Sequence, residues 1–266
     1  MVEARQWHNE ELTEPRRGEY PLSASAVKKY KRCPAQFKFR YIDQLDGMGG
    51  SSPYSTLGSA VHEAIERVLI DNDVAELSKT PNQMRKKMMD EYRSINPDIA
   101  QKHSDTAKKC IQVAARYVVM QDVEEFRGIE ENFKFALTRS DIDHSFRGLI
   151  DVATPTEVWD WKTGKNVYDI DEIIQGMIYA MGFLAKYGQP PEQIRFVYLQ
   201  KEIERTIEPT DDNWQQMLDF ARDAIRAKQS GDFEATPEES KCYWCGYEGY
   251  CDASPVGAGA VTWEHI

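Results

Sequence analysis

Apolar residues recur along the 266-residue chain with two periods, one typical of helices and one typical of strands. Spacings of three and four residues predict a helix that begins near residue 22 and further helices over 57–69, 82–92, 106–126, 170–186 and 211–230. Shorter apolar stretches rich in β-branched and aromatic residues predict strands over 131–137, 146–152, 157–162, 194–200 and 203–208. The turns between them predict that the first three strands form an antiparallel meander and the last two a hairpin.

The same pattern divides the chain into six segments. We assign 1–21 as a polar arm, 22–56 as a helical segment, 57–128 as a helical region with an insertion, 129–230 as the core, 231–252 as a cysteine-rich segment and 253–266 as a loose tail. The glycines and serines of 47–55 predict a flexible linker. Ser23 or Ser25 is a candidate N-cap of the first helix, and Pro34 is expected to end one helix and begin the next.

Composition limits the classes of protein to which the chain can belong. No apolar run approaches the roughly 18 residues that a membrane-spanning helix needs, and the polar N-terminus is unlike a secretory signal. We therefore expect no membrane contact and a reducing, cytoplasmic location. The net charge of −11 argues against non-specific adhesion to nucleic acid over the whole surface.

A basic track is nevertheless present near the N-terminus. Six cations fall within thirteen residues, and they could either contact phosphates or form an ordinary solvated helix face (Lys28, Lys29, Lys31, Arg32, Lys38 and Arg40).

Two of the predicted strands carry polar residues in positions that do not suit a core hairpin. Side chains alternate faces along a strand, so Asp160 and Lys162 share one face while Trp159 and Trp161 share the other. The hairpin partner can bring Asp151 alongside the Asp160–Lys162 pair. Two carboxylates beside an ammonium group suit a hard divalent cation such as Mg²⁺ or Mn²⁺. The alternative interpretation is a surface hairpin with an ordinary Asp–Lys pair.

These residues resemble the core motif of a known family. Gly148-x-x-Asp151, followed by Asp160-x-Lys162-Thr163-Gly164, is similar to the motif of the PD-(D/E)XK nucleases, in particular their RecB-type branch. The resemblance implies a restriction-endonuclease-like core of α/β (α+β) class, with a central mixed β-sheet flanked by helices and a helical insertion. Asp160 stands where many relatives have Glu, a variant that should still bind metal.

Two further motifs match the RecB-type branch. Gly58-x-x-x-His62 matches its histidine motif, although a lone histidine at a helix edge is usually only a packed side chain. Gln175 and Tyr179 lie four residues apart on one helix face and match its Gln-x-x-x-Tyr element. Glu131, at the start of the first core strand, is either an accessory acid or an ordinary surface glutamate.

The resemblance also implies a role for each site residue. The implied shell around Mg²⁺ or Mn²⁺ consists of His62, Asp151, Asp160 and the backbone carbonyl of Trp161. Lys162 would position the attacking water or offset negative charge in the transition state. Gln175 and Tyr179 would orient the DNA strand.

Four of the five cysteines have the spacing of a metal centre. Cys242, Cys245 and Cys251 lie close together in sequence, and Cys33 is the natural fourth ligand. Spacing alone leaves zinc and a 4Fe-4S cluster open. The segment from Leu22 to Phe37 resembles the N-terminal signature of iron–sulfur RecB-type nucleases, which implies a 4Fe-4S cluster that joins the two ends of the chain. Cys110 is expected to be a structural thiol.

Taken together, the resemblance implies a DNA exonuclease that acts on ends of single-stranded DNA in recombination, repair or processing. Its relatives include CRISPR-adaptation nucleases and AddB-type subunits, so recombination or CRISPR-adaptation proteins are candidate partners. Duplex ends are an alternative substrate. Two other functions stay open: an endonuclease for flapped or branched DNA, and a non-catalytic DNA-binding scaffold subunit.

Overall fold

The computed structural model describes residues 12–16, 20–47, 53–71, 80–95, 97–121, 125–139, 142–167 and 169–256. Its strands are β1 (Leu12–Thr13), β2 (Gly128–Thr138), β3 (Asp143–Ala153), β4 (Glu157–Lys162), β5 (Gln193–Tyr198) and β6 (Ile203–Ile207). Its helices are α1 (Ala24–Arg32), α2 (Pro34–Phe37), α3 (Pro53–Asp71), α5 (Pro81–Ile95), α6 (Pro97–Lys102), α7 (Ser104–Met120), α8 (Asp169–Tyr187), α9 (Asp211–Ser230) and α10 (Glu239–Tyr243). A π-helical turn, η2 (Lys38–Ile42), follows α2, and a 3₁₀ turn, η3 (Glu248–Tyr250), follows α10.

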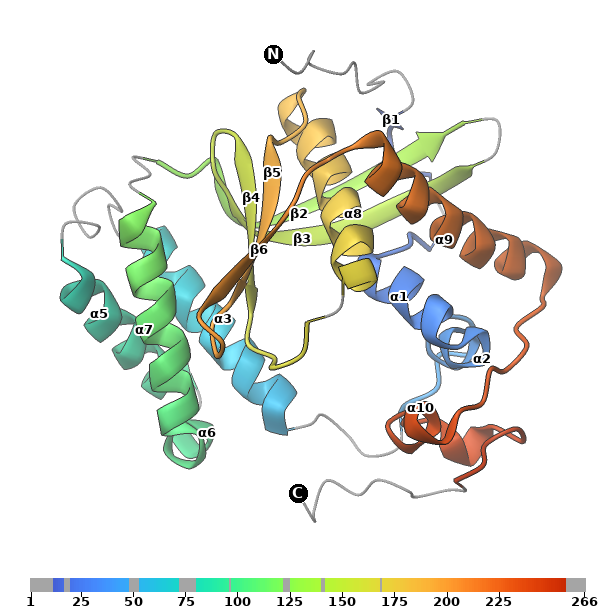
Figure 1. The fold of residues 1–266 in the computed structure, drawn as a ribbon, viewed down its shortest axis with the longest axis horizontal. Coiled ribbons are helices and arrows are strands. Elements are labelled where there is room, and N and C mark those ends of the chain that lie inside the picture. Colours follow the sequence, from blue (N-terminus) through green and yellow to red (C-terminus); the bar gives the residue numbers. More distant parts are fainter. Residues whose placement is uncertain are drawn as a thin grey trace.

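The strands form one six-stranded sheet in the order β1-β2-β3-β4-β5-β6. All neighbours are antiparallel except β4 and β5, which run parallel and are joined through α8. A parallel pair needs such a crossover because its strands enter from the same end of the sheet. This mixed sheet flanked by helices confirms the predicted fold class (Figure 1).

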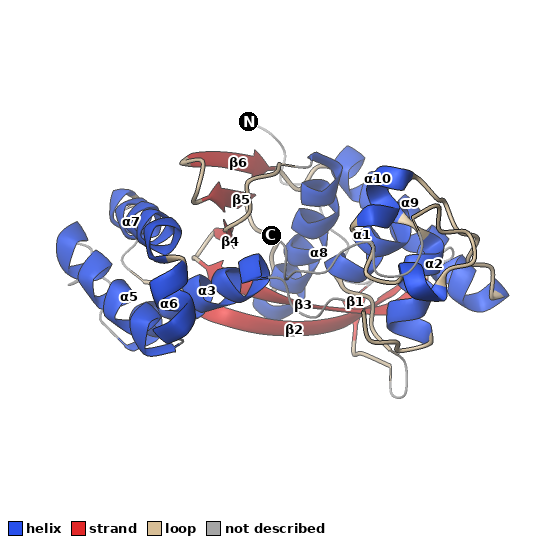
Figure 2. Cartoon of the chain, turned by 90° about the horizontal axis from the view of Figure 1, so that it is seen from below, coloured by secondary structure: helices blue, strands red, loops and turns tan. Residues whose placement is uncertain are grey.

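Two hydrophobic cores lie on the two faces of the sheet. The first packs α1, α8 and α9 against residues such as Phe135, Phe146 and Phe196. The second packs α3, α5 and α7 against Trp159 and Trp161. Figure 2 shows the insertion helices α5, α6 and α7 at one end of the sheet and α1, α2, α9 and α10 at the other. The burial of both tryptophans in the second core confirms the predicted alternation along β4. None of the helices in the described part of the chain could cross a bilayer.

The ring of Phe133 sets the distance between α8 and the sheet. A Cβ atom added to Gly148 of β3 would lie 2.3 Å from this ring, and one added to Gly182 of α8 would lie 2.5 Å from it. Phe133 also meets Tyr179 edge to face, with ring centroids 6.1 Å apart. The helix that carries Gln175 and Tyr179 therefore rests on a close-packed contact.

The start of α1 is fixed to β3. Leu22 donates its amide to the Ser145 carbonyl at 2.9 Å and accepts from the Arg147 amide at 2.8 Å. Ser23 caps the helix, since its hydroxyl accepts from the Ala26 amide at 3.2 Å. Both this cap and the predicted break at Pro34 are confirmed.

Three expectations about the helical region need correction. The predicted linker 47–55 is too long, because α3 already begins at Pro53; residues 48–52 lie outside the described part. The second insertion helix ends at Met120 and not at Phe126, because Phe126 leaves the helix to pack edge to face on Trp159. The short helix α6, between α5 and α7, was not predicted.

We predict that Gly148→Ala destabilises the protein by about 1–3 kcal/mol, because the new methyl group would collide with the Phe133 ring. Urea unfolding should show a lower midpoint with an unchanged slope. Gly164→Ala is the matched control, since a Cβ there meets nothing within 4 Å. Equal midpoints for the two variants would show that the contact does not constrain the fold.

Candidate active site

The candidate active site lies where β3 and β4 separate. The two strands pair only at Val152–Trp159 and Ala153–Val158. Beyond this point the Asp151 carboxylate replaces the strand ladder, since its Oδ2 accepts the Trp161 amide proton at 2.7 Å. Leaving a buried amide unpaired costs roughly 1–3 kcal/mol, so this bond holds the carboxylate in the gap.

Three side chains from three elements meet beside this gap. His62 of α3, Glu130 of β2 and Asp151 of β3 each offer one ligand atom, and these atoms all lie within 4.8 Å of one another. His62 Nδ1 is 3.4 Å from Asp151 Oδ2. Helix α3 approaches this closely because Gly58 packs on Thr163, whose hydroxyl oxygen would lie 2.8 Å from a Cβ at that glycine. One imidazole and two carboxylates suit Mg²⁺ or Mn²⁺.

Glu130 is the glutamate at this site, and Glu131, for which the sequence left an accessory acid and an ordinary glutamate open, is not part of it. Glu131 shares a sheet face with Phe133 and forms an ion pair with Lys186 of α8. The ladder pairs on either side place Glu130 opposite Asp151. Its φ of 50° is a left-handed conformation that costs a non-glycine residue about 1 kcal/mol or more. Strand alternation from Phe133 is the sequence signal that separates the two glutamates.

A second group of side chains joins the end of β4 to α8. Lys162 Nζ lies 2.6 Å from Asp160 Oδ2 and donates to Gln175 Oε1 at 2.9 Å. Asp160 Oδ1 accepts from Gln175 Nε2 at 2.7 Å and from the Tyr179 hydroxyl at 3.2 Å. Gln175 and Tyr179 therefore lie on the predicted side of α8. They hold Asp160 in one orientation.

Lys28 of α1 joins this group, although the sequence assigned it only to the basic track. Its Nζ donates to Gln175 Oε1 at 3.0 Å, so two ammonium groups converge on one carbonyl oxygen. Burial, followed by repulsion from Lys162, lowers the pKa of Lys28. No motif marks this position, because it depends on the path of α1 across β3.

The acids in the gap repel one another. Burial, followed by repulsion from Asp160, raises the pKa of Asp151 well above its usual range. Burial and repulsion from Asp151 raise the pKa of Glu130 to about 7. Burial lowers the pKa of His62, which favours the neutral imidazole that binds metals. Positive charge at the site would relieve both repulsions.

The predicted metal shell is brought together only in part. His62 and Asp151 meet as expected, whereas Glu130 and not Asp160 completes the group of three ligand atoms within 4.8 Å. Trp161 offers its amide to Asp151, and its carbonyl as a ligand stays a prediction. A cleft of about 620 Å³ opens beside these residues.

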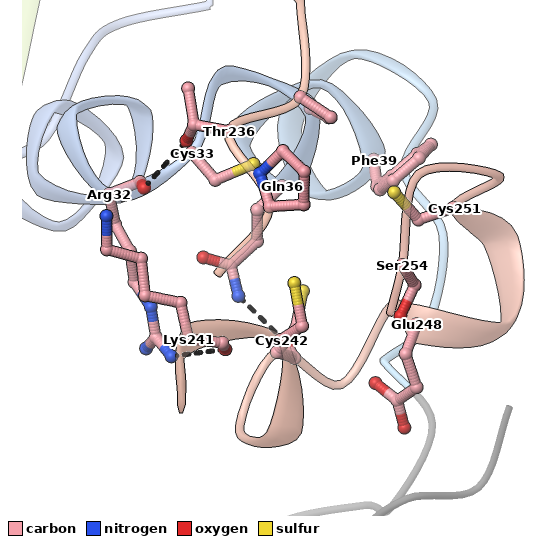
Figure 3. Close-up of a pocket in the computed structure, with 14 residues that line it drawn as sticks. Arg32, Cys33, Gln36, Phe39, Thr236, Lys241, Cys242, Glu248, Cys251 and Ser254 are labelled. Carbon is pink, nitrogen blue, oxygen red and sulfur yellow. Dashed lines mark hydrogen bonds between the residues drawn. The ribbon is translucent and has the colours of Figure 1, made fainter. Parts of the chain in front are cut away.

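Four cysteines line a single cavity between the N-terminal helices and the C-terminal segment. Figure 3 shows the sulfurs of Cys33, Cys242 and Cys251 directed into it, and Cys245 also lines it. Four thiols from two distant segments are a donor set that fits a metal centre. The fifth, Cys110, lies in the second core, where burial raises its pKa to about 11. Its burial agrees with the expected structural thiol.

The polar groups around Cys33 favour a thiolate. Burial opposes ionisation of its thiol, but hydrogen bonds from Thr236 and Gln36 outweigh burial and lower its pKa. Gln36 also donates to the Cys245 carbonyl at 2.8 Å, which ties the two segments together. Because thiolates are the ligand form of cysteine, this environment fits a ligand role.

We predict that Mn²⁺ stabilises the protein more at about pH 8 than at about pH 5. Without a cation, Glu130 keeps its proton in the folded state up to a pKa of about 7, compared with 4.5 in the unfolded chain. The folded state binds more protons in that window, so stability falls as pH rises through it. Thermal unfolding with Mn²⁺ or EDTA at both pH values measures the difference.

The matched variants are Glu130→Gln and Glu131→Gln. The first removes the repulsion, and in EDTA near pH 8 it should be about 1 kcal/mol more stable than wild type after allowing for solvent screening. It should also lose most of the stabilisation by Mn²⁺. The second, whose glutamate pairs with Lys186, should keep that stabilisation. An unchanged Mn²⁺ effect in Glu130→Gln would contradict its assignment to the site.

Comparison with known proteins identifies the family. A search of curated proteins found no match. A solved structure titled "Crystal structure of SSO0001" aligns with 71% of this chain and 95% of its own, at 16% sequence identity and a TM-score of 0.37, which is too low to support a conclusion. The family model described as "PD-(D/E)XK nuclease superfamily" matches residues 21–252, which include all the site residues above. The chain belongs to the PD-(D/E)XK nuclease superfamily, whose enzymes hydrolyse nucleic acids with divalent metal ions.

Proposed function

We propose that the protein is a metal-dependent DNA exonuclease of the RecB type, acting on ends of single-stranded DNA in recombination, repair or processing. The observation that carries the proposal is the convergence of two motifs on the gap beside Asp151 and Asp160. His62 arrives from α3 beside Asp151, and Gln175 arrives from α8 onto Asp160. The sequence separates these motifs by more than a hundred residues. Chance patterns would have no reason to meet at one gap in the sheet.

The proposed chemistry is phosphodiester hydrolysis. A divalent cation, held by His62, Glu130 and Asp151, would polarise the scissile phosphate and lower the pKa of a bound water. Lys162 is held at 2.6 Å from Asp160 Oδ2, so its ammonium group stands ready to offset negative charge that grows on the phosphoryl oxygens. Gln175 fixes both partners of this pair.

Lys28 adds to the positive charge on the same side. The ammonium groups of Lys28 and Lys162 both donate to Gln175 Oε1. Among the hydrogen-bond partners of Gln175 in the described part of the chain, only Asp160 supplies a carboxylate to offset these two positive charges. Burial and then repulsion from Lys162 lower the pKa of Lys28, and a phosphate anion would reduce that repulsion. The arrangement is therefore better suited to a negatively charged substrate than to a neutral one.

We further propose that the four cysteines hold a 4Fe-4S cluster, with zinc as the alternative. The support is that the four cysteines line one cavity, together with the resemblance to iron–sulfur RecB-type nucleases. Such a centre would close a loop from Cys33 to Cys251 and restrict the unfolded chain. The cytoplasmic location belongs to this proposal, because reduced thiols persist in a reducing compartment.

We predict that Asp160→Asn and Lys162→Ala each lower DNA cleavage by at least about a hundredfold while the fold stays intact. Lys165→Ala is the matched control, because this exposed lysine lies three residues beyond the end of β4 and should leave the rate unchanged. End-labelled linear and circular single strands are digested with Mn²⁺ or with EDTA. A wild-type rate for Lys162→Ala would show that the active site is misassigned. Cleavage of the circular strands would show that the enzyme is an endonuclease and not an exonuclease.

We predict that Cys242→Ala removes the brown colour and the bound iron of anaerobically purified protein and lowers its solubility. Cys110→Ala is the control, since this thiol lies in the second core and should leave the iron content unchanged. Metal analysis of the wild type separates the two proposed centres. Zinc without iron would show that the centre is a zinc site. A stable, active Cys242→Ala variant without metal would show that the fold does not depend on a centre that joins the two ends of the chain.

A further inference from the structure

A groove of about 800 Å³ lies between α1 and α10. The groove is lined by five basic side chains and one carboxylate, that of Asp171. The basic residues are Lys28, Lys29, Lys31, Arg32 and Lys241. The whole chain carries a net charge of −11, so this local excess of positive charge runs against the overall balance. Such a contrast favours a polyanionic ligand at this place on the surface.

The lysines of the groove are crowded. Burial, followed by repulsion from Arg32, lowers the pKa of Lys29, and burial with repulsion from Lys162 lowers that of Lys28. Lys31 pairs with Asp171 at 3.1 Å, but both side chains are about a third exposed, so water screens this pair. Anionic groups bound in the groove would therefore lower its electrostatic energy.

The groove is connected to the active site through Lys28. This residue lines the groove and donates to Gln175 Oε1 at 3.0 Å, while Gln175 contacts Lys162 and Asp160. Asn166, four residues beyond Lys162, also lines the groove. An extended chain in the groove could therefore continue to the position of the scissile phosphate beside Lys162.

The groove also has an aromatic wall. Trp244 lines it, is 50% exposed, and packs edge to face on Tyr243 with ring centroids 5.1 Å apart. Trp244 stands between Cys242 and Cys245, so a metal centre held by these cysteines would restrain its position. Aromatic side chains stack on bases that are unpaired, whereas the bases of a duplex already stack on one another.

We propose that this groove binds a single-stranded nucleic acid, with phosphates on the lysines of α1 and one base stacked on Trp244. The proposal rests on the proposed nuclease function and adds a substrate-binding role to the cysteine-rich segment. The residues between the two cysteines then form part of the substrate site, in addition to any structural role of the metal centre.

The test measures binding apart from cleavage. Full-length protein in EDTA is titrated with a fluorescent oligothymidylate of about 15 nucleotides, and anisotropy gives the affinity. Trp244→Ala should weaken binding about tenfold or more, and Trp244→Phe should restore most of the affinity because it keeps a stacking ring. Lys29→Ala should reduce the slope of log affinity against log salt by about 0.7, the value for one phosphate contact to a single strand.

Two matched controls separate the groove from general effects. Tyr250 is exposed to a similar degree (47%) beside the last cysteine, but it is not among the residues that line the groove. Lys134 is an exposed lysine on β2. Tyr250→Ala and Lys134→Ala should bind like wild type. Metal content and circular dichroism of each variant show whether the centre and the fold are retained.

The proposal fails if Trp244→Ala, with its centre intact, binds as tightly as wild type or no more weakly than Tyr250→Ala. It also fails if a duplex of equal length or polyglutamate competes as well as the single strand, because the groove would then select only negative charge. An oligouridylate arm compares RNA with DNA, and similar affinities support the stacking and phosphate contacts that both share.

Cleavage by the same proteins with Mn²⁺ keeps the two proposals distinguishable. A protein that binds the strand as expected but never cuts it would overturn the nuclease function and leave the groove in place. If the protein cuts DNA but Trp244→Ala and Lys29→Ala bind the strand as tightly as wild type, only the proposal for the groove is overturned.

Discussion

Repulsion between carboxylates buried at the gap between β3 and β4 is the constraint on which the site depends. Asp151 and Asp160 are only 8% and 3% exposed, so water contributes little to their screening. The protein compensates them differently. Asp160 has the ammonium of Lys162 and two hydrogen bonds from α8. Asp151 has the Trp161 amide and His62, whose pKa is lowered by burial so that the neutral imidazole is favoured. Glu130 adds further negative charge. The uncompensated charge therefore lies on the His62 side, where a cation would be held.

The packing of α8 makes this division of charge possible. At its first turn, the buried Glu172 accepts from Tyr198 of β5 and pairs with Arg205 of β6 at 3.1 Å. Further along, the Phe133 ring fits against Gly182. The helix is thus fixed to the sheet at two places, and Gln175 lies between them. Its amide can then serve as a rigid bridge between Asp160 and Lys162, because a long side chain on a mobile helix would lose more entropy on being ordered.

The sequence predicted those features that depend on local periodicity. Alternation along β4 separated Asp160 from the tryptophans, and helical spacing placed the helix over 211–230, which α9 matches. Glu130 and Lys28 were not assigned to the site, because each arrives through a long-range arrangement. Glu130 depends on the register of β2 against β3 and on a left-handed backbone. Lys28 depends on the bridge between Leu22 and β3. Alternation from Phe133 can separate Glu130 from Glu131, but neither the strand register nor the Leu22 bridge leaves a pattern among neighbouring residues.

Helix α1 links the cysteine centre to the catalytic group. Its nine residues begin just after Leu22, which is hydrogen-bonded to β3, and end at Arg32, just before Cys33. Lys28 therefore lies between two anchored ends, and a metal centre at Cys33 would restrain the second of them. Arg32 reinforces this end, since its guanidinium donates to the Lys241 carbonyl at 2.8 Å. Loss of such a centre would remove this restraint at the Cys33 end of α1, and the position of Lys28 on Gln175 would become less well defined. A metal centre held by the four cysteines would thus influence the candidate active site through the placement of one lysine.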